Sequence, residues 1–192
     1  MRVSQQEMDA SHARIVRGTA QLMRERGLLA TSVADAMQAA GLTHGGFYRH
    51  FGTKDALLAE ALASAFEQFL GGLEGAMQAG PAGEALDAFR SLYLSQLHVD
   101  HPGEGCPVPA LGAEVARQPE ALREVFGAGV RRVVDLLAQD QPGPQQVQRA
   151  AALREFAMLA GAVTLARACD AATSAAVLAA CRGEGVGEEV SA

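Results

Sequence analysis

Residues 32–58 decide the fold, and they read SVADAMQAAGLTHGGFYRHFGTKDALL. Ser32 followed three residues later by Asp35 is the pattern of a capping box, in which the two side chains satisfy amides at the start of a helix. Gly41 is placed to end that helix, and a second short helix follows it. Two short helices joined by a tight glycine-containing turn are the arrangement of a helix-turn-helix.

The second short helix is expected from Thr43 to about His50, with Thr43 as its cap. It contains two consecutive glycines, each of which costs a helix roughly 1 kcal/mol relative to alanine. This cost is understandable if the backbone must lie close to another molecule, and DNA is a good candidate. The alternative is a poorly formed helix or a loop over the core. Leu42 and Phe47 are expected to anchor the pair of helices to the core.

The rest of the chain also predicts helices, because apolar residues recur at helical spacing and glycines and prolines fall between such stretches. A helix from about Asp9 to Arg26 precedes the motif, and a long one starts at Thr53. We therefore expect an all-α protein with a three-helix head in residues 1–52, a helical body in residues 53–182 and a flexible tail in residues 183–192. Further helices are expected at about 81–97, 108–117, 119–138, 144–169 and 171–181, with a loop at 101–107.

The composition narrows the class of protein. The net charge is −6, but residues 1–55 carry +2 and the remainder −8, which suits a DNA-facing head on an acidic body. The uncharged stretches near the C-terminus are shorter than the roughly 20 apolar residues of a membrane-spanning helix. No signal peptide is recognisable, so a cytoplasmic protein is expected. The three cysteines fit no metal spacing, and neither a metal nor a cofactor is predicted.

Residues 32–58 resemble the DNA-binding signature of the TetR family of bacterial transcriptional regulators. The matching elements are the capping hydroxyl, Ala-Gly before an aliphatic residue and a threonine, and then Gly, Tyr, His-Phe and Lys. Ala36 and Met37 depart from the more usual aliphatic–Ala pair, for which we expect altered packing. The resemblance implies a homodimer that binds double-stranded DNA, with residues 53–182 serving effector binding and dimerisation.

The resemblance also assigns roles by position. Residues at the start of the second helix would face bases or the nearest phosphates, while Tyr48 and His50 would hydrogen-bond phosphates. Lys54, the only lysine, would add an ion pair to a phosphate, unless it is plain surface charge; Arg49 is open between a base contact and solvent. Phosphate contacts position such a protein, and base contacts specify the sequence. The expected DNA-binding residues are Ser32, Thr43, His44, Gly45, Tyr48, Arg49, His50 and Lys54.

The last two predicted helices are rich in alanine and other small residues, which permit close contact between helices. Two such helices from each subunit can build a four-helix interface, as TetR-like proteins do. An alanine-rich core within one subunit is the alternative. A two-fold dimer would place its reading helices about 34 Å apart and imply a palindromic operator.

The resemblance further implies an effector pocket enclosed by the central helices, although aromatic residues at helical spacing are also typical of plain core. Cys106 is the expected cap of the next helix, because Pro107 is favoured at the first helical position. A helix N-terminus stabilises a thiolate, so Cys106 is either a redox or electrophile sensor or an inert, partly buried residue. The candidate effector residues are Phe89, Tyr93, Cys106, Phe126 and Met158.

Two other classes of protein fit the sequence less well. An enzyme using Cys106 with His98 or His101 lacks a recognisable orienting residue or oxyanion element. A helical scaffold or ligand-binding protein would show no affinity for DNA. We expect a regulator, in the family's usual sense a repressor, released from a palindromic operator by an unknown small molecule or by modification of Cys106. Its operator, effector and target genes cannot be read from the sequence.

Overall fold

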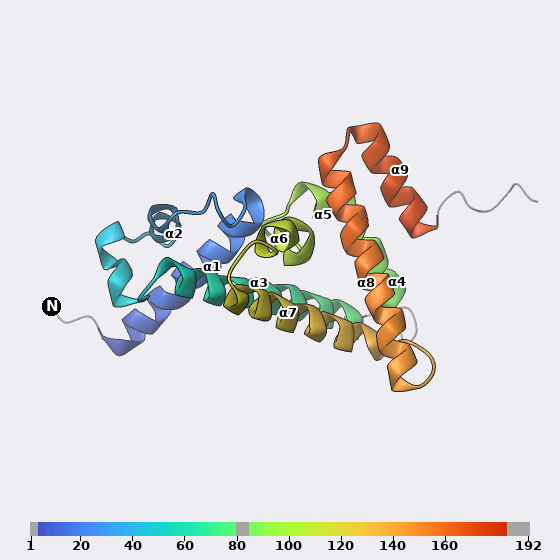
Figure 1. The fold of residues 1–192 in the computed structure, drawn as a ribbon, viewed down its shortest axis with the longest axis horizontal. Coiled ribbons are helices and arrows are strands. Elements are labelled where there is room, and N and C mark those ends of the chain that lie inside the picture. Colours follow the sequence, from blue (N-terminus) through green and yellow to red (C-terminus); the bar gives the residue numbers. More distant parts are fainter. Residues whose placement is uncertain (1–3, 80–84, 184–192) are drawn as a thin grey trace, which may run out of the picture. The chain divides into compact units, whose positions relative to one another are not determined.

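The computed structural model describes residues 4–79 and 85–183 of the chain, and every regular element in them is a helix (Figure 1). This confirms the predicted all-α class. In chain order the elements are α1 (Gln5–Arg26), α2 (Val33–Ala39), the 3-10 helix η1 (His44–Arg49), α3 (Lys54–Ala79), α4 (Ala85–Tyr93), α5 (Gln96–Asp100), α6 (Pro107–Val115), α7 (Glu120–Ala138), α8 (Gln145–Ala168) and α9 (Ala171–Arg182).

These elements form two compact units. Unit 1 contains residues 4–69 and 102–129, and unit 2 contains the described residues of 70–101 and 130–183. The helices α3 and α7 contribute residues to both units. The boundary expected from the sequence, between a DNA-binding head that ends at residue 52 and a body that begins at residue 53, is a division by function. It stays a prediction. Most of the expected tail, residues 184–192, lies outside the described residues.

The head within unit 1 is built around one apolar cluster. Residues of α1, α2, η1 and the start of α3 are buried together, and Val16, Val33 and Leu42 pack against their edge. This confirms that Leu42 and Phe47 anchor the two short helices. The buried members are Ile15, Ala36, Met37, Ala40, Phe47, Phe51 and Leu57.

The first helix begins four residues earlier than expected. Ser4 caps it, because its hydroxyl accepts the Glu7 amide at 3.2 Å and its own amide donates to the Glu7 carboxylate at 2.8 Å. The Ser4 amide and hydroxyl, which both donate to the Glu7 carboxylate, lower the pKa of Glu7. The sequence therefore holds a second capping box, which the pattern of apolar residues alone did not reveal.

The second short helix differs from the expected one. It is a 3-10 helix; Thr43 occupies the expected N-cap position, but its side chain makes no capping hydrogen bond. The reason is that the Gly46 amide, three residues on, donates to the main-chain carbonyl of Thr43 at 3.0 Å. That i to i+3 pattern is the 3-10 pattern, and it uses the amide that a capping hydroxyl would have bound.

The helix expected at 81–97 is two helices. Its predicted start at Pro81 lies outside the described residues, and α4 ends at Tyr93. Ser95 then caps α5, since its hydroxyl accepts the His98 amide at 3.2 Å. In addition, Arg182 of α9 donates to the Leu94 carbonyl at 2.8 Å. This contact, from a residue far along the chain, stabilises the end of α4 and was not visible as a local signal.

Unit 2 is organised around α8, which packs against α4, α5 and α9. Figure 1 shows α9 returning alongside α8. The Arg167 side chain of α8 donates to the carbonyls of His98 and Val99 at 2.6 and 3.1 Å, so it satisfies carbonyls in the last turn of α5. The core of this unit combines the aromatic residues Phe89, Tyr93 and Phe156 with aliphatic ones, which include Leu94, Val133, Leu137, Leu159 and Val163.

Candidate nucleic-acid interface

The start of α2 is fixed by the capping box that the sequence predicted. The Ser32 hydroxyl accepts the Asp35 amide at 3.1 Å, and the Asp35 carboxylate accepts the Ser32 amide at 3.1 Å. The hydrogen bonds from the Ser32 side chain and backbone, in that order, lower the pKa of Asp35. Ser32 is exposed, and its hydroxyl is engaged within the cap.

The turn between α2 and η1 is tight because Gly41 has a φ of 70°, a conformation that side chains other than glycine rarely adopt. The Gly41 amide donates to the Gln38 carbonyl and the Leu42 amide to the Met37 carbonyl, both at 2.9 Å. The turn therefore sets where η1 begins and leaves the residues before and at its start exposed. These are Thr43, His44 and Gly45.

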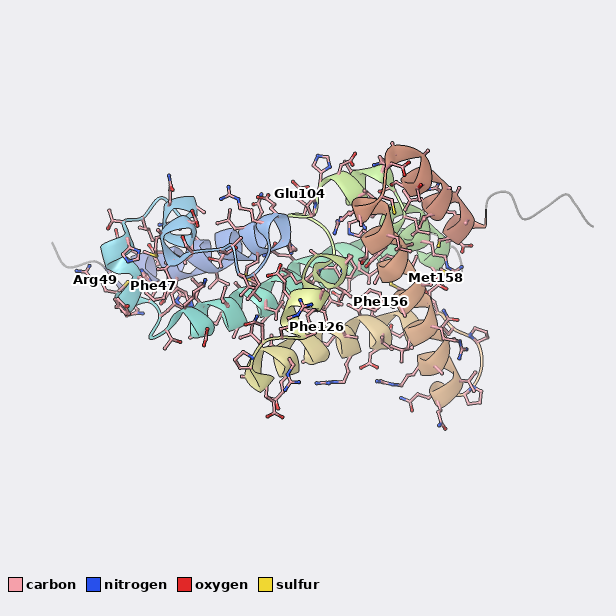
Figure 2. All side chains as sticks on the ribbon, turned by 45° about the horizontal axis from the view of Figure 1, so that its top comes forward. Phe47, Arg49, Glu104, Phe126, Phe156 and Met158 are labelled. Carbon is pink, nitrogen blue, oxygen red and sulfur yellow. The ribbon has the colours of Figure 1, made fainter. Side chains whose placement is uncertain are left out.

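Phe47 and Tyr48 point to opposite environments on η1. Phe47 is 2% exposed and stacks on Phe51 at a centroid distance of 5.7 Å. Tyr48 is 79% exposed and meets the edge of Phe47 at 5.2 Å. Arg49 is exposed as well, and Figure 2 shows Phe47 and Arg49 together at this end of unit 1. The buried aromatic ring thus holds a helix whose other side chains face solvent.

His50 lies beside a histidine that the sequence analysis did not single out. The rings of His50 and His12 are 6.0 Å apart, and His12 stacks on Phe51 at 4.5 Å. Burial, followed by the neighbouring His12 and Arg49, lowers the pKa of His50. His12 also contacts the Glu60 carboxylate of α3 at 2.7 Å. These influences favour the neutral form of the His50 ring.

Lys54 is the first residue of α3 and is half-buried. The hydroxyl of the preceding Thr53 accepts the Ala56 amide at 3.1 Å, which caps the helix. Lys54 and Arg26 both help to lower the pKa of Asp35, so Lys54 lies within electrostatic reach of the first turn of α2. The starts of α2 and α3 therefore present their polar groups near one another.

The candidate effector residues fall into both units. Phe126 belongs to unit 1, where its ring meets the edge of Phe66 at 5.5 Å. Phe89 and Tyr93 belong to unit 2 and contact each other at 5.3 Å. Met158, also in unit 2, is exposed.

Phe156 of α8 was not predicted as a site residue, and it packs near Tyr93 with ring centroids 6.3 Å apart. Figure 2 labels it near Met158 on α8. His98, which meets the Tyr93 ring at 4.5 Å and its carbonyl at 2.7 Å, completes this aromatic cluster. The signal was available, because Phe156 shares an apolar helical spacing with the buried Leu159 and Val163.

Cys106 is 0% exposed and occupies the expected position before α6. Its sulfur accepts the Val108 amide at 3.5 Å, and Pro107 is the first residue of the helix. This confirms Cys106 as the cap of α6. The burial is more complete than the partly buried state considered from the sequence.

No helix in residues 4–79 and 85–183 is long and apolar enough to span a membrane. No group of three or more histidine, cysteine, aspartate or glutamate side chains in those same residues is arranged to hold a metal ion.

The chain matches one family model and two curated proteins of the same kind. Residues 15–61 match the family model described as bacterial regulatory proteins, tetR family. Two uncharacterised HTH-type transcriptional regulators from Mycobacterium tuberculosis strains are each 31% identical over 175 residues, covering 83% of this chain and 86% of the relative.

Solved structures share the fold. A TetR-family transcriptional regulator from Cytophaga hutchinsonii superposes with a TM-score of 0.77 at 24% identity, covering 95% of this chain and 96% of that one. The reduced form of Escherichia coli NemR gives a TM-score of 0.76 at 21% identity, with coverage of 91% and 94%.

Proposed function

The chain belongs to the TetR family of DNA-binding transcriptional regulators, and we propose that it is a repressor that binds a palindromic operator as a homodimer. The family consists of regulators, so the chain is not an enzyme. Regulators of this family form dimers on DNA. The sign of regulation, the residues that contact DNA and the route of release are the parts that we propose.

The observation that carries the proposal is the exposed start of η1 on a buried aromatic anchor. The buried Phe47 side chain anchors η1 to the core, while Thr43, His44 and Gly45 are exposed. In a helix-turn-helix the N-terminal residues of the second helix contact base edges in the major groove. A Cβ at Gly45 would meet nothing within 4 Å. Packing within the chain therefore does not require glycine there, whereas close approach of DNA does.

Phosphate contacts are assigned to the residues that flank this helix. Tyr48 offers an exposed hydroxyl, Arg49 an exposed guanidinium, and Lys54 an ammonium group at the start of α3. The surroundings of His50 favour its neutral form, so we assign it a hydrogen bond to a phosphate rather than an ion pair. Ser32 would contribute through the first turn of α2, where backbone amides suit an anion.

The dimer is assigned to α8 and α9. The helix α8 exposes Val147, Leu153, Met158 and Leu165 although it packs on α9. A second copy of the chain would cover these apolar side chains in a four-helix interface. Two-fold symmetry then places the two copies of η1 to read the two halves of a palindrome.

Release is assigned to movement of α6, through a small molecule or modification of Cys106. The other end of α6 touches the head, since the Glu114 carboxylate accepts the Leu29 amide at 2.9 Å. A Cβ at Gly27 would lie 2.3 Å from the same carboxylate. A shift of α6 would therefore reach the turn before α2. The E. coli structure is described as a reduced form, which agrees with redox control in a protein of this fold.

The test is recovery of operator DNA. The purified protein is incubated with sheared DNA of its source genome, and bound fragments are sequenced. We expect the recovered fragments to share a palindrome. The variants Tyr48→Phe and Lys54→Gln should recover less of this DNA. Arg123→Gln, which removes an exposed arginine of α7, is the matched control and leaves recovery unchanged. Transcription from the recovered promoter falls when the protein is added.

Three outcomes contradict parts of this assignment. No enrichment even at low salt, where phosphate contacts are strongest, would favour a helical ligand-binding protein without a DNA site. Increased transcription from the recovered promoter would make the protein an activator. A Tyr48→Phe variant that prefers a different sequence at unchanged affinity would place Tyr48 on a base.

A further inference from the structure

Arg24 is a charged side chain in the interior of unit 1. It lies in the last turn of α1 and is 4% exposed. Its Nη1 donates to the Ala65 carbonyl at 3.2 Å and its Nη2 to Oε1 of Gln68 at 2.9 Å, whereas Nε is buried without a hydrogen-bond partner. Both acceptors are uncharged. Because a buried cation costs several kcal/mol unless an anion compensates it, this environment favours a negative charge near Arg24.

The loop that carries Cys106 packs against the same part of α1. A Cβ at Gly103 would lie 2.5 Å from Oε1 of Glu25 and 3.0 Å from Cγ of Gln21, one turn apart on α1. Burial lowers the pKa of Arg24, and Cys106 is the neighbouring group whose negative charge would raise it most. The carboxylates of Glu25 and Glu104 act in the same direction more weakly, and both are exposed.

The start of α6 adds a second favourable interaction. The sulfur of Cys106 already accepts the Val108 amide, and the partial positive charge of a helix N-terminus favours a thiolate. Burial alone would favour the neutral thiol. A buried arginine and a helix N-terminus together oppose that effect, and both are positioned by the packing of unit 1.

We propose that Arg24 and the first turn of α6 hold Cys106 as a thiolate that reacts with a small, uncharged hydroperoxide. This inference rests on the Cys106 route of release proposed above and adds the residue and the reagent. The sulfur attacks one peroxide oxygen, so an S–O bond forms as the O–O bond breaks. The other oxygen leaves as hydroxide or alkoxide and is protonated by solvent. The sulfur is oxidised by two electrons to a sulfenic acid, and the peroxide is reduced.

The burial of Cys106 selects the class of reagent. A thiol that is 0% exposed is reached by a small neutral molecule more readily than by a bulky or charged one. Cys169 is exposed and Cys181 is partly exposed in the single chain, and both belong to the helical pair assigned to the dimer. They provide internal references in the same chain, because Arg24 belongs to the other compact unit.

The first experiment measures the ultraviolet absorbance of the thiolate against pH in the full-length protein, with Cys106→Ser as the blank. We expect a midpoint below the ordinary cysteine value of about 8.5. Arg24→Gln raises this midpoint by about one pH unit or more, which is about tenfold less thiolate at a given pH below it. Arg24→Lys restores most of the shift, and Arg26→Gln, an exposed neighbour on α1, leaves it unchanged.

A wild-type midpoint at or above about 8.5 overturns the proposal without any substitution, even if Arg24→Gln fails to fold. Identical midpoints in folded wild type and Arg24→Gln overturn it as well. Circular dichroism establishes that each variant is folded before it is titrated.

The second experiment follows oxidation by hydrogen peroxide through the mass of the peptide that contains Cys106. Arg24→Gln should slow this oxidation about tenfold, in line with the thiolate fraction, with unchanged rates at Cys169 and Cys181. Equal rates at Cys106 in both proteins overturn the proposal.

Operator affinity measured after oxidation separates this inference from the proposed function. Oxidation that depends on Arg24 but leaves operator affinity unchanged supports the Arg24–Cys106 pair and overturns the release route. Loss of operator affinity at the same rate in wild type and Arg24→Gln supports the release route and overturns the pair.

Discussion

The helix pair α2–η1 and the helix pair α8–α9 each bury one face, but they expose different chemistry on the other. The first pair exposes hydroxyl, imidazole and guanidinium groups around Tyr48. The second exposes aliphatic side chains, of which Leu165 is 54% exposed. Polar donors suit a phosphate backbone and base edges, whereas aliphatic groups suit another protein surface. The exposed face therefore indicates the partner, while the buried face indicates only the fold.

The largest effect is expected for Phe47 and Tyr48, which are neighbours in η1 although one is buried and the other exposed. Phe47→Ala removes a buried ring and should lower the free energy of unfolding by about 3–5 kcal/mol. Tyr48→Ala alters an exposed ring and should change that free energy by no more than about 0.5 kcal/mol. Chemical denaturation of both variants measures the difference. Equal losses would mean that η1 is not anchored through Phe47.

The second test concerns the aliphatic face of α8. Leu165→Glu should weaken self-association about a hundredfold or more, because a carboxylate buried in an interface lacks a partner. Analytical ultracentrifugation measures the dimer, and operator affinity should fall with it. Leu97→Glu, which alters an exposed leucine on α5, is the control. A dimer that tolerates Leu165→Glu would move the interface away from α8.

A smaller effect is expected for the polar face of α2–η1. Tyr48→Phe removes one hydroxyl and should lower affinity for every DNA sequence about tenfold. Lys54→Gln should reduce the slope of log affinity against log salt concentration by about one, since one phosphate contact is lost. Binding titrations at several salt concentrations distinguish the two. An unchanged slope would make Lys54 plain surface charge.

The smallest effect concerns His98 in unit 2 and depends on pH. Burial lowers the pKa of His98, the hydrogen bond with the Tyr93 carbonyl opposes this, and the Arg167 charge lowers it further. The unfolded chain therefore takes up a proton at higher pH than the folded one. The free energy of unfolding should fall as pH drops through about 6.5 and level off below the folded pKa.

His98→Asn should flatten that dependence, because the titrating ring is gone while a hydrogen-bond donor remains. His101→Asn, which alters an exposed histidine, is the matched control. Denaturant titrations across this pH range give the comparison. A slope that persists in His98→Asn would assign the dependence to another group.

The head was largely predictable because its signals are local. The capping box of Ser32 and Asp35 and the left-handed turn at Gly41 lie within ten residues of one another and do not depend on the rest of the chain. The cap at Cys106 was readable from Pro107 for the same reason. Two features of the head differed: α1 begins earlier, at the Ser4 cap, and η1 is a 3-10 helix, because the choice between α and 3-10 geometry rests on a single amide, that of Gly46.

What could not be predicted depends on contacts between distant residues. The break between α4 and α5 involves Arg182, and the link from α6 to the head includes the hydrogen bond from the Leu29 amide to the Glu114 carboxylate. Arg24 left a signal that was not used, since it follows the buried Ala20 by four residues and so lies on the buried face of α1. A charged side chain on the buried face of a helix is unusual, so Arg24 could have been singled out from the sequence.

Lys54 has a practical consequence, because it is the only lysine among the 192 residues. A dye that acylates ε-amino groups has one lysine side chain to label, at the first residue of α3 and four residues beyond His50. A dimer labelled this way carries one dye beside each η1. Energy transfer between the two dyes then reports the spacing of the two heads in the absence of DNA, with peroxide or a candidate effector added.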